Sequence, residues 1–242
     1  MKIKFLLFAV LAVPAIAATD NNFNSWFVYN GDHAFGKSKW GLHAEGQWRR
    51  HDGPLKWQQY QLRPGVNYQL TKSVALTFGY AFTESYRYGD FPVGHRFPEH
   101  RIFEQAIYTR RIGKLDFANR FRLEQRYIGQ SALQPDGSYS STPYRYENRF
   151  RYQLRTNIPL SFHNGRHYIG VYDEILFNFG KNVVGNYFDQ NRAFISFGTY
   201  IARDTRFEVG YLEQTIQRRG GQIFEFNHTL QVVINCRLPF GH

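Results

Sequence analysis

The sequence predicts an all-β protein that folds as a single antiparallel, up-and-down transmembrane β-barrel of about 10–12 strands. Three observations predict it: apolar and charged residues alternate at period two, aromatic residues make up 18% of the chain, and an export signal precedes the alternating part. Because successive side chains of a strand point to opposite faces, alternation at period two sorts the two kinds of residue only in a β-strand.

The first 17 residues have the features of a secretory signal peptide. Lys2 and Lys4 precede an apolar run at 5–13, and residues 15–17 (AIA) have the small-x-small form after which signal peptidase cuts. The apolar run is too short to span a bilayer. We therefore expect Sec-type export and a mature chain that starts at Ala18, with a formal charge of +11 − 2 = +9.

The mature chain, residues 18–242, is expected to be one domain, because no linker, low-complexity run or change of composition divides it. Its single cysteine forms no internal disulfide. The negative mean hydropathy excludes a bundle of membrane-spanning helices. A chain this polar could cross a bilayer only as a closed barrel, which hydrogen-bonds every backbone group internally.

Residues 144–157 (YRYENRFRYQLRTN) show the alternation most clearly. One face of this stretch carries Tyr144, Tyr146, Asn148, Phe150, Tyr152 and Leu154, and the other carries Arg145, Glu147, Arg149, Arg151, Gln153 and Arg155. In a soluble sheet the charges would face water and the rings the core. In a membrane barrel the rings face lipid and the charges face the lumen.

Eleven segments carry this pattern in chain order. They lie at 23–35, 39–50, 56–70, 73–88, 99–112, 114–128, 144–158, 167–179, 188–202, 205–217 and 223–238. Many exceed the five or six residues that are roughly usual for soluble strands, which favours strands tilted through a bilayer. Since a barrel with both termini in the periplasm needs an even number, we expect residues 23–35 to split or bend, or one segment not to be a strand.

The connections between these segments alternate in length. Short turns occur at 36–38, 71–72, 113 and 202–204 and a moderate one at 159–166, whereas longer connections occur at 51–55, 89–98, 129–143, 180–187 and 218–222. Outer-membrane barrels have short periplasmic turns and longer external loops. We therefore expect 89–98 and 129–143 to face outside, and 71–72 and 113 to face the periplasm.

Several blocks resemble a known family. In order they are RPGVNYQL, FGYAF, EHRIFEQ, RFRLEQRYI, RYENRFRYQLRTNIPL, YDEILFNFG, FDQNRAFISFG and VGYLEQ. Over nearly the whole mature chain they are similar to the uncharacterised outer-membrane family DUF2490, a domain of unknown function. The resemblance implies a bacterial outer-membrane barrel and no particular activity. Phe240, close to the C-terminus and in phase with the apolar face, resembles the signal read by the outer-membrane assembly machinery.

The charged faces supply the candidate site. The residues predicted to line the lumen are Arg49, Arg63, Arg120, Arg122, Glu124, Arg126, Arg145, Glu147, Arg149, Arg151, Arg155, Glu174, Arg192 and Glu208, together with Glu45, Asp116 and Arg206. Segments 114–128 and 144–158 should pair, which brings seven arginines against three acids. Buried guanidinium groups must be hydrogen-bonded or neutralised by carboxylates, by water or by a bound anion. They either form an ion-paired network that fills a structural barrel or line a narrow passage for small or anionic solutes.

A lipid-modifying hydrolase of the outer membrane is the alternative function. Such an enzyme needs a serine next to a histidine. The candidates are His51, His95 and His100 with Ser85, Ser131, Ser138, Ser140 and Ser141. No spacing links any such pair on one strand, so we identify no catalytic residue and expect a protein that is not an enzyme.

The sequence favours few other binding partners. The basic residues alternate along strands and do not form a tail or a recognition helix, which argues against nucleic acid. His163 and His167 flank a turn and do not by themselves make a metal site, and no cofactor motif is present. The expected partners are outer-membrane lipid and, during biogenesis, the assembly machinery, while the sequence leaves the oligomeric state open.

Overall fold

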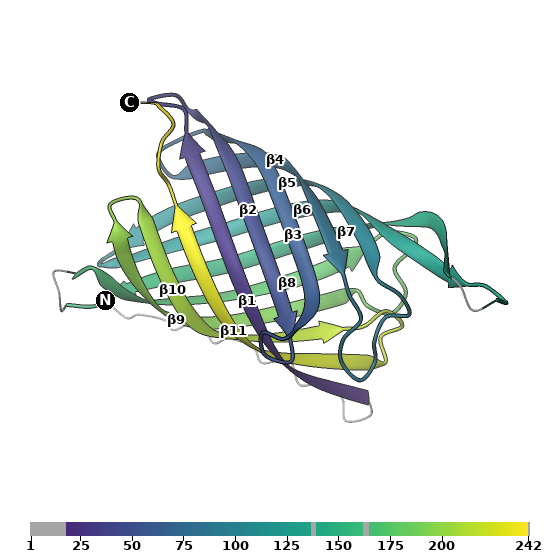
Figure 1. Cartoon of the computed structure of the whole chain (residues 1–242). Coiled ribbons are helices and arrows are strands. Elements are labelled where there is room, and N and C mark those ends of the chain that lie inside the picture. Colours follow the sequence, from purple (N-terminus) through teal and green to yellow (C-terminus); the bar gives the residue numbers. More distant parts are fainter. Residues whose placement is uncertain (1–17, 137–138, 162–164, 242) are drawn as a thin grey trace.

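The computed structural model describes residues 18–136, 139–161 and 165–241, which form one closed β-barrel (Figure 1). Its eleven strands are β1 (Ala18–Ala34), β2 (Trp40–His51), β3 (Lys56–Gln69), β4 (Val74–Ser85), β5 (Phe97–Ile112), β6 (Leu115–Leu133), β7 (Tyr139–Pro159), β8 (His167–Phe179), β9 (Phe188–Ala202), β10 (Thr205–Gln217) and β11 (Ile223–Cys236). The predicted all-β barrel is confirmed. Within the described residues, no helix is both long and apolar enough to cross a membrane.

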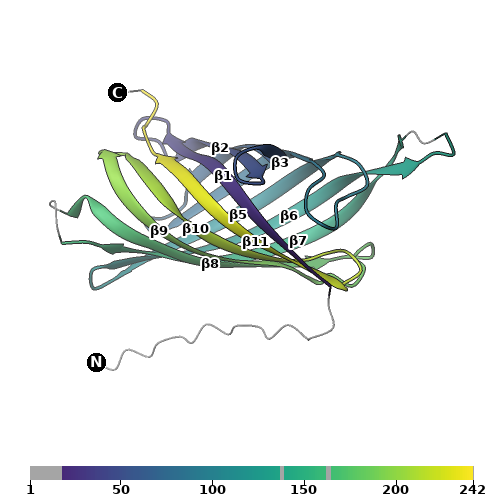
Figure 2. The ribbon, with the colours of Figure 1, turned by 60° about the horizontal axis from the view of Figure 1, so that its bottom comes forward.

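The barrel closes through a parallel pair. Strands that follow each other in sequence pair antiparallel, whereas β1 pairs parallel with β11, from Ala18 opposite Ile223 to Gly31 opposite Cys236. Figures 1 and 2 show these two strands side by side. The expectation of an even strand number was wrong, because one parallel seam lets an odd number of strands close. Residues 18–34 form one strand that does not split.

The two ends of the barrel carry different connections. The turn end holds the connections after β1, β3, β5, β7 and β9, and the loop end holds those after β2, β4, β6, β8 and β10. The predicted grouping of long and short connections is therefore correct. The chain enters β1 at the loop end and leaves β11 at the turn end.

The connection predicted at 129–143 is in part a hairpin. β6 and β7 continue to pair beyond a register shift between Ile128 and Gln130, as far as Leu133 opposite Tyr139. This hairpin extends past the rim of the barrel as the teal projection in both views (Figures 1 and 2). The strand ladder therefore continues into a segment that the sequence predicted to be a connection.

The distribution of side chains is the reverse of that in a soluble protein. On β7, Tyr144 and Tyr146 are 48% and 37% exposed, whereas Arg149 and Arg151 are 3% and 5% exposed. The same order holds around the barrel, with aromatic and aliphatic side chains outside and charged side chains inside. An apolar outer surface of this extent is suited to lipid.

The interior has an apolar side and a charged side. Next to the seam, β1, β9, β10 and β11 contribute a hydrophobic cluster of Trp26, Val28, Phe194, Leu212 and Val233, with Tyr172 packed against it. Most inward arginines and carboxylates lie on the other strands, which form the charged side of the lumen, but Arg192, Glu208 and Glu225 come from β9, β10 and β11. The two sides therefore meet, and the apolar cluster does not exclude charged groups.

The C-terminal residues extend the seam at the turn end. The backbone N–H of Phe240 donates to the Ala34 carbonyl, and that of Gly36 donates to the Phe240 carbonyl, both at 2.8 Å. The Phe240 ring stacks on Phe35 with centroids 6.0 Å apart. Its role in assembly stays a prediction.

The parallel seam predicts a disulfide that only this closure allows. Phe27 and Val232 are direct partners on β1 and β11, and neighbouring strands lie about 4.8 Å apart, within disulfide range. In a Cys236→Ala background, we expect Phe27→Cys with Val232→Cys to cross-link under oxidation, read as altered mobility on a non-reducing gel. Phe27→Cys with Phe226→Cys, displaced along the ladder, should not. The opposite result would disprove the register.

Candidate functional site

The carboxylate of Glu124 is the centre of the charged side of the lumen. It is fully buried and accepts hydrogen bonds from Arg149 at 2.6 and 2.8 Å and from Arg151 at 2.8 Å. Arg63 and Arg122 each lie 3.9 Å from the same carboxylate. Four guanidinium groups thus share one anion.

The pairing of β6 with β7 produces this arrangement. Its register places Glu124 opposite Arg149 and Arg122 opposite Arg151, and both pairs point into the barrel. Partners in an antiparallel pair project from the same face of the sheet. The alternating sequence of the two strands therefore becomes an alternating surface inside the lumen.

Further ion pairs extend from Glu124 to other strands. Glu174 accepts from Arg120 and Arg151, each at 2.8 Å, and lies 3.4 Å from Arg192. Glu45 pairs with Arg63 and Arg122, and Asp189 pairs with Arg149. The first ion-pair group therefore consists of Arg63, Arg120, Arg122, Arg149, Arg151 and Arg192 with Glu45, Glu124, Glu174 and Asp189.

A second ion-pair group lies on β5, β6 and β7. Glu99 accepts from Arg101 at 2.7 Å and from Arg126 at 2.5 Å. Glu147 accepts from Arg145 at 2.6 Å and lies 3.9 Å from Arg126. Three arginines in this group face two carboxylates.

Arg49 stands apart from both groups. It is 8% exposed, yet among the described residues it pairs with no carboxylate. Its guanidinium donates to the side-chain oxygens of Gln47, at 2.6 and 2.9 Å, and Gln59, at 2.7 Å. It stacks over the Trp26 ring, 3.9 Å from the centroid. This buried cation is hydrogen-bonded but not neutralised.

The ion pairs leave an excess of positive charge. Among the described residues, the first group contributes 6 − 4 = +2, the second contributes 3 − 2 = +1, and Arg49 contributes +1, which together give +4 for these groups. The pairs Arg155–Glu208 and Arg218–Glu225 add no net charge. A buried excess of this kind favours the entry of anions.

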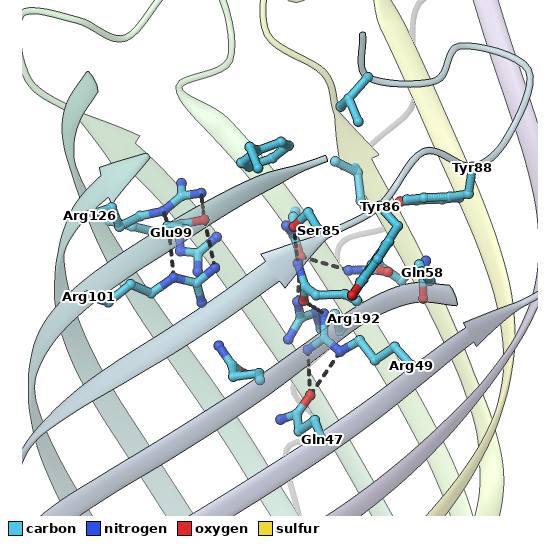
Figure 3. A pocket seen from close by; sticks show the side chains of 18 of the residues that line it. Gln47, Arg49, Gln58, Ser85, Tyr86, Tyr88, Glu99, Arg101, Arg126 and Arg192 are labelled. Carbon is cyan, nitrogen blue, oxygen red and sulfur yellow. Dashed lines mark hydrogen bonds and ion pairs between the residues drawn. The ribbon is translucent and has the colours of Figure 1, made fainter. Parts of the chain in front are cut away.

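A cavity of about 180 Å³ opens among these groups near the loop end (Figure 3). Eight arginines line it, and Glu99 is the one acid among its described lining residues. The arginines are Arg49, Arg63, Arg101, Arg126, Arg149, Arg151, Arg192 and Arg218. Six glutamines complete much of the wall, so its side chains present mainly N–H donors and neutral amide oxygens.

The connection between β4 and β5 reaches from the cavity wall to the seam. Tyr88 lines the cavity and donates its hydroxyl to Glu225 at 2.5 Å, and the Asp90 amide donates to Asp20 at 3.2 Å. Burial, reinforced by the Glu225 carboxylate, raises the pKa of Tyr88, so the phenol keeps the proton that it donates. This loop is therefore fixed to β1 and β11 beside the cavity.

The structure brings most of the predicted lumen residues together, with four exceptions. Arg155 and Glu208 form a separate pair at 2.7 Å. Asp116 is exposed and pairs with Arg111 next to the β5–β6 turn, so it does not line the lumen. Arg206 lies 6.0 Å over the Tyr168 ring. Whether the inward residues carry solute stays a prediction.

Several site residues were missed from the sequence. Glu99 and Arg101 alternate on β5, but Phe103 shares their face and is fully buried, so the apolar-outward pattern fails there. Arg218 lies in a loop, where periodicity gives no signal. The glutamines around Arg49 carry no charge and so did not stand out.

The residues considered for a hydrolase are engaged elsewhere. Ser85 accepts a hydrogen bond from Gln59 at 2.8 Å, and Ser140 accepts one from Gln134 at 2.5 Å. His100 contacts the hydroxyls of Tyr80 and Tyr144. His51 lies 3.3 Å from Asn24. Ser138 lies outside the described residues, as do the side chains of Ser131 and Ser141.

Charged side chains within a closed barrel and aromatic side chains outside it define a membrane-spanning β-barrel. Within this class of protein, the chain belongs to the family described as "Protein of unknown function (DUF2490)", whose model matches residues 23–225. The predicted resemblance is thus confirmed. In the described part of the chain, no cluster of three or more His, Cys, Asp or Glu side chains is placed to hold a metal ion.

One solved structure, titled "NanC porin structure in rhombohedral crystal form", is similar to this chain. It shares 10% sequence identity, and the alignment covers 82% of this chain and 90% of that one with a TM-score of 0.45. No curated protein gives a significant match to the chain.

The central position of Glu124 predicts a large loss of stability when its charge is removed. Glu124→Gln keeps the shape but leaves Arg149 and Arg151 short of a counter-charge, and breaking a buried ion pair costs roughly 3–5 kcal/mol. We expect a lower temperature for conversion of the folded gel band to the unfolded one. Asp116→Asn, at the exposed pair with Arg111, is the matched control and should change this temperature little. Equal temperatures for both variants would contradict the role of Glu124.

Proposed function

We propose that this protein is a porin-like barrel of the bacterial outer membrane with a narrow, anion-selective passage. The observation that carries the proposal is the cavity wall, whose described residues include eight arginines and one carboxylate, with the other carboxylate partners of these arginines lying behind the wall. Fixed positive charge in a low-dielectric lumen lowers the energy of an entering anion and raises that of a cation. Planar guanidinium groups also match the oxygen atoms of carboxylate and phosphate.

The first ion-pair group makes the passage narrow. Arg63 on β3 lies 3.9 Å from Glu124 on β6, so these contacts bridge strands that are not neighbours. Passage of a solute requires an arginine to exchange its carboxylate partner for the solute anion. Such exchange admits small anions and excludes bulky ones.

A structural barrel without conduction is the second candidate. The hydrophobic cluster around Trp26 and the ion pairs of Glu124 fill much of the lumen, which favours a closed, stiff barrel. The two candidates differ in what the charge excess does. In a passage it attracts anions, and in a structural barrel it has no transport role.

Conductance in a planar bilayer separates the candidates. Under a KCl gradient, the purified barrel should pass chloride better than potassium, read from the reversal potential. Arg149→Gln with Arg151→Gln should weaken this preference, because glutamine keeps polar partners for Glu124 and removes two positive charges. A selective conductance unaffected by the exchange would disprove the assignment of these side chains.

Negligible conductance of the intact barrel would instead support the structural candidate. The same exchange would then mainly lower the unfolding temperature, because Glu124 would lose its counter-charges.

The proposed location predicts the behaviour of the chain in cells. The apolar exterior and the signal at residues 1–17, which lie outside the described part, support Sec-type export and insertion into the outer membrane. We expect the mature protein in the outer-membrane fraction of a Gram-negative cell, with a gel band that shifts on heating. Recovery as a soluble periplasmic monomer would disprove the location.

A further inference from the structure

Trp26 holds two guanidinium groups at one point of the lumen. Arg49 lies 3.9 Å and Arg192 lies 5.5 Å from the centroid of its ring. The ring is 2% exposed, and its N–H donates to the side-chain oxygen of Gln58 at 2.8 Å, which fixes its orientation. Two cations are therefore held close together by one rigid aromatic side chain.

Phe103 holds a second pair of arginines, which provides an internal comparison. Arg63 and Arg122 lie 5.6 and 4.9 Å from its centroid. Both of these arginines pair with Glu45 and Glu124, so the Phe103 site carries its own anions. The equivalent neutralisation is missing at Trp26.

Among the ion pairs of the described residues, one carboxylate contacts the two arginines at Trp26. Glu174 lies 3.4 Å from Arg192 but also binds Arg120 and Arg151 at 2.8 Å. Arg49 has only amide oxygens as described acceptors. Its three hydrogen bonds leave two of the roughly five N–H donors of a guanidinium unused. Because Arg49 and Arg192 both line the cavity, an anion there could reach them.

The cavity limits the size of that anion. Its volume is about 180 Å³. Inorganic phosphate or a short dicarboxylate fits such a space, whereas a polymer does not. The charge excess of the lumen groups favours an anion with more than one negative charge.

We propose that the loop-end cavity is a binding site for a small multivalent oxyanion, held by Arg49 and Arg192 beside Trp26. Bidentate hydrogen bonds from guanidinium groups to two oxygen atoms of the anion would use the free donors of Arg49. The proposal deepens the anion selectivity proposed above, and it rests on that function only for its biological role. Binding itself requires no conduction.

Gln59→Glu tests the site with a nearly isosteric change. It places a carboxylate where an amide oxygen now lies 2.7 Å from Arg49, and the Ser85 hydroxyl can reorient to donate to it. The barrel would then supply its own anion. We expect calorimetric titrations of the purified barrel with inorganic phosphate and with succinate to show at least tenfold weaker binding of both in Gln59→Glu, at an unfolding temperature no lower than that of the unsubstituted protein.

Two further variants complete the test. Arg49→Gln should also weaken binding at least tenfold, and Arg111→Gln, at the exposed pair with Asp116, should leave it unchanged. No binding of either anion by the unsubstituted barrel would overturn the proposal, and so would unchanged binding in Gln59→Glu. Tighter binding of phosphate than of succinate, or the reverse, identifies the preferred chemistry.

The outcome also separates this site from the passage. Chloride selectivity in the bilayer without phosphate or succinate binding would retain the passage and reject the site. Binding that follows the predicted order of variants in a barrel without conductance would retain the site and reject the passage.

Discussion

The carboxylate of Glu124 joins parts of the barrel that the backbone ladder does not. Ladder hydrogen bonds connect each strand only to its two neighbours, whereas Glu124 on β6 contacts Arg63 on β3. Glu174 on β8 likewise contacts Arg120 on β6. These contacts across the lumen restrain the cross-section of the barrel and hold the arginines around the cavity in fixed positions.

The charged side of the lumen does more than fill space. Replacing buried ion pairs by packed apolar side chains is often neutral or stabilising, so ion pairs are weak evidence for stability alone. The seam side of this barrel shows the apolar solution, with Phe194 and Leu212 almost fully buried inside. The charged side keeps arginines in excess over carboxylates, and the cavity among them reaches Arg192 on β9. That combination is the physical basis of the proposed anion preference.

Alternation predicted most of the fold because every spanning strand must separate lipid-facing from inward-facing residues. The bounds of β8, β9 and β10 match the segments expected at 167–179, 188–202 and 205–217. The parallel seam could not be predicted, because alternation defines the faces of a strand but not the direction of its partner. The inward orientation of Trp26 could not be predicted either, because the residue type alone does not show whether an aromatic side chain faces the lumen or the lipid.

The positions of carboxylates in the site were less predictable than those of arginines. Asp116 shares the inward phase of β6 but lies next to a turn, where a side chain reaches water and pairs with Arg111. Asp189 is the second residue of β9 and pairs with Arg149 on β7, a contact that bridges over β8. Sequence periodicity predicts which face of the sheet a side chain lies on. These pairs also depend on the position of each residue along the barrel axis, which the tilt and register of the strands determine.

The hydrogen-bond partners of Arg49 are amides and not carboxylates, so its positive charge remains in the cavity. Gln47 donates to Glu45 through its nitrogen and accepts from Arg49 through its oxygen, so it links a carboxylate to a guanidinium without bringing the two into contact. Gln59 acts in the same way between Ser85 and Arg49. Glutamate in place of Gln59 would keep the contact with Arg49, with the Ser85 hydroxyl reoriented to donate, and would cancel the charge. Glutamine orients Arg49 as firmly and leaves its charge uncompensated, and an oriented, uncompensated guanidinium is what a binding site for an anion requires.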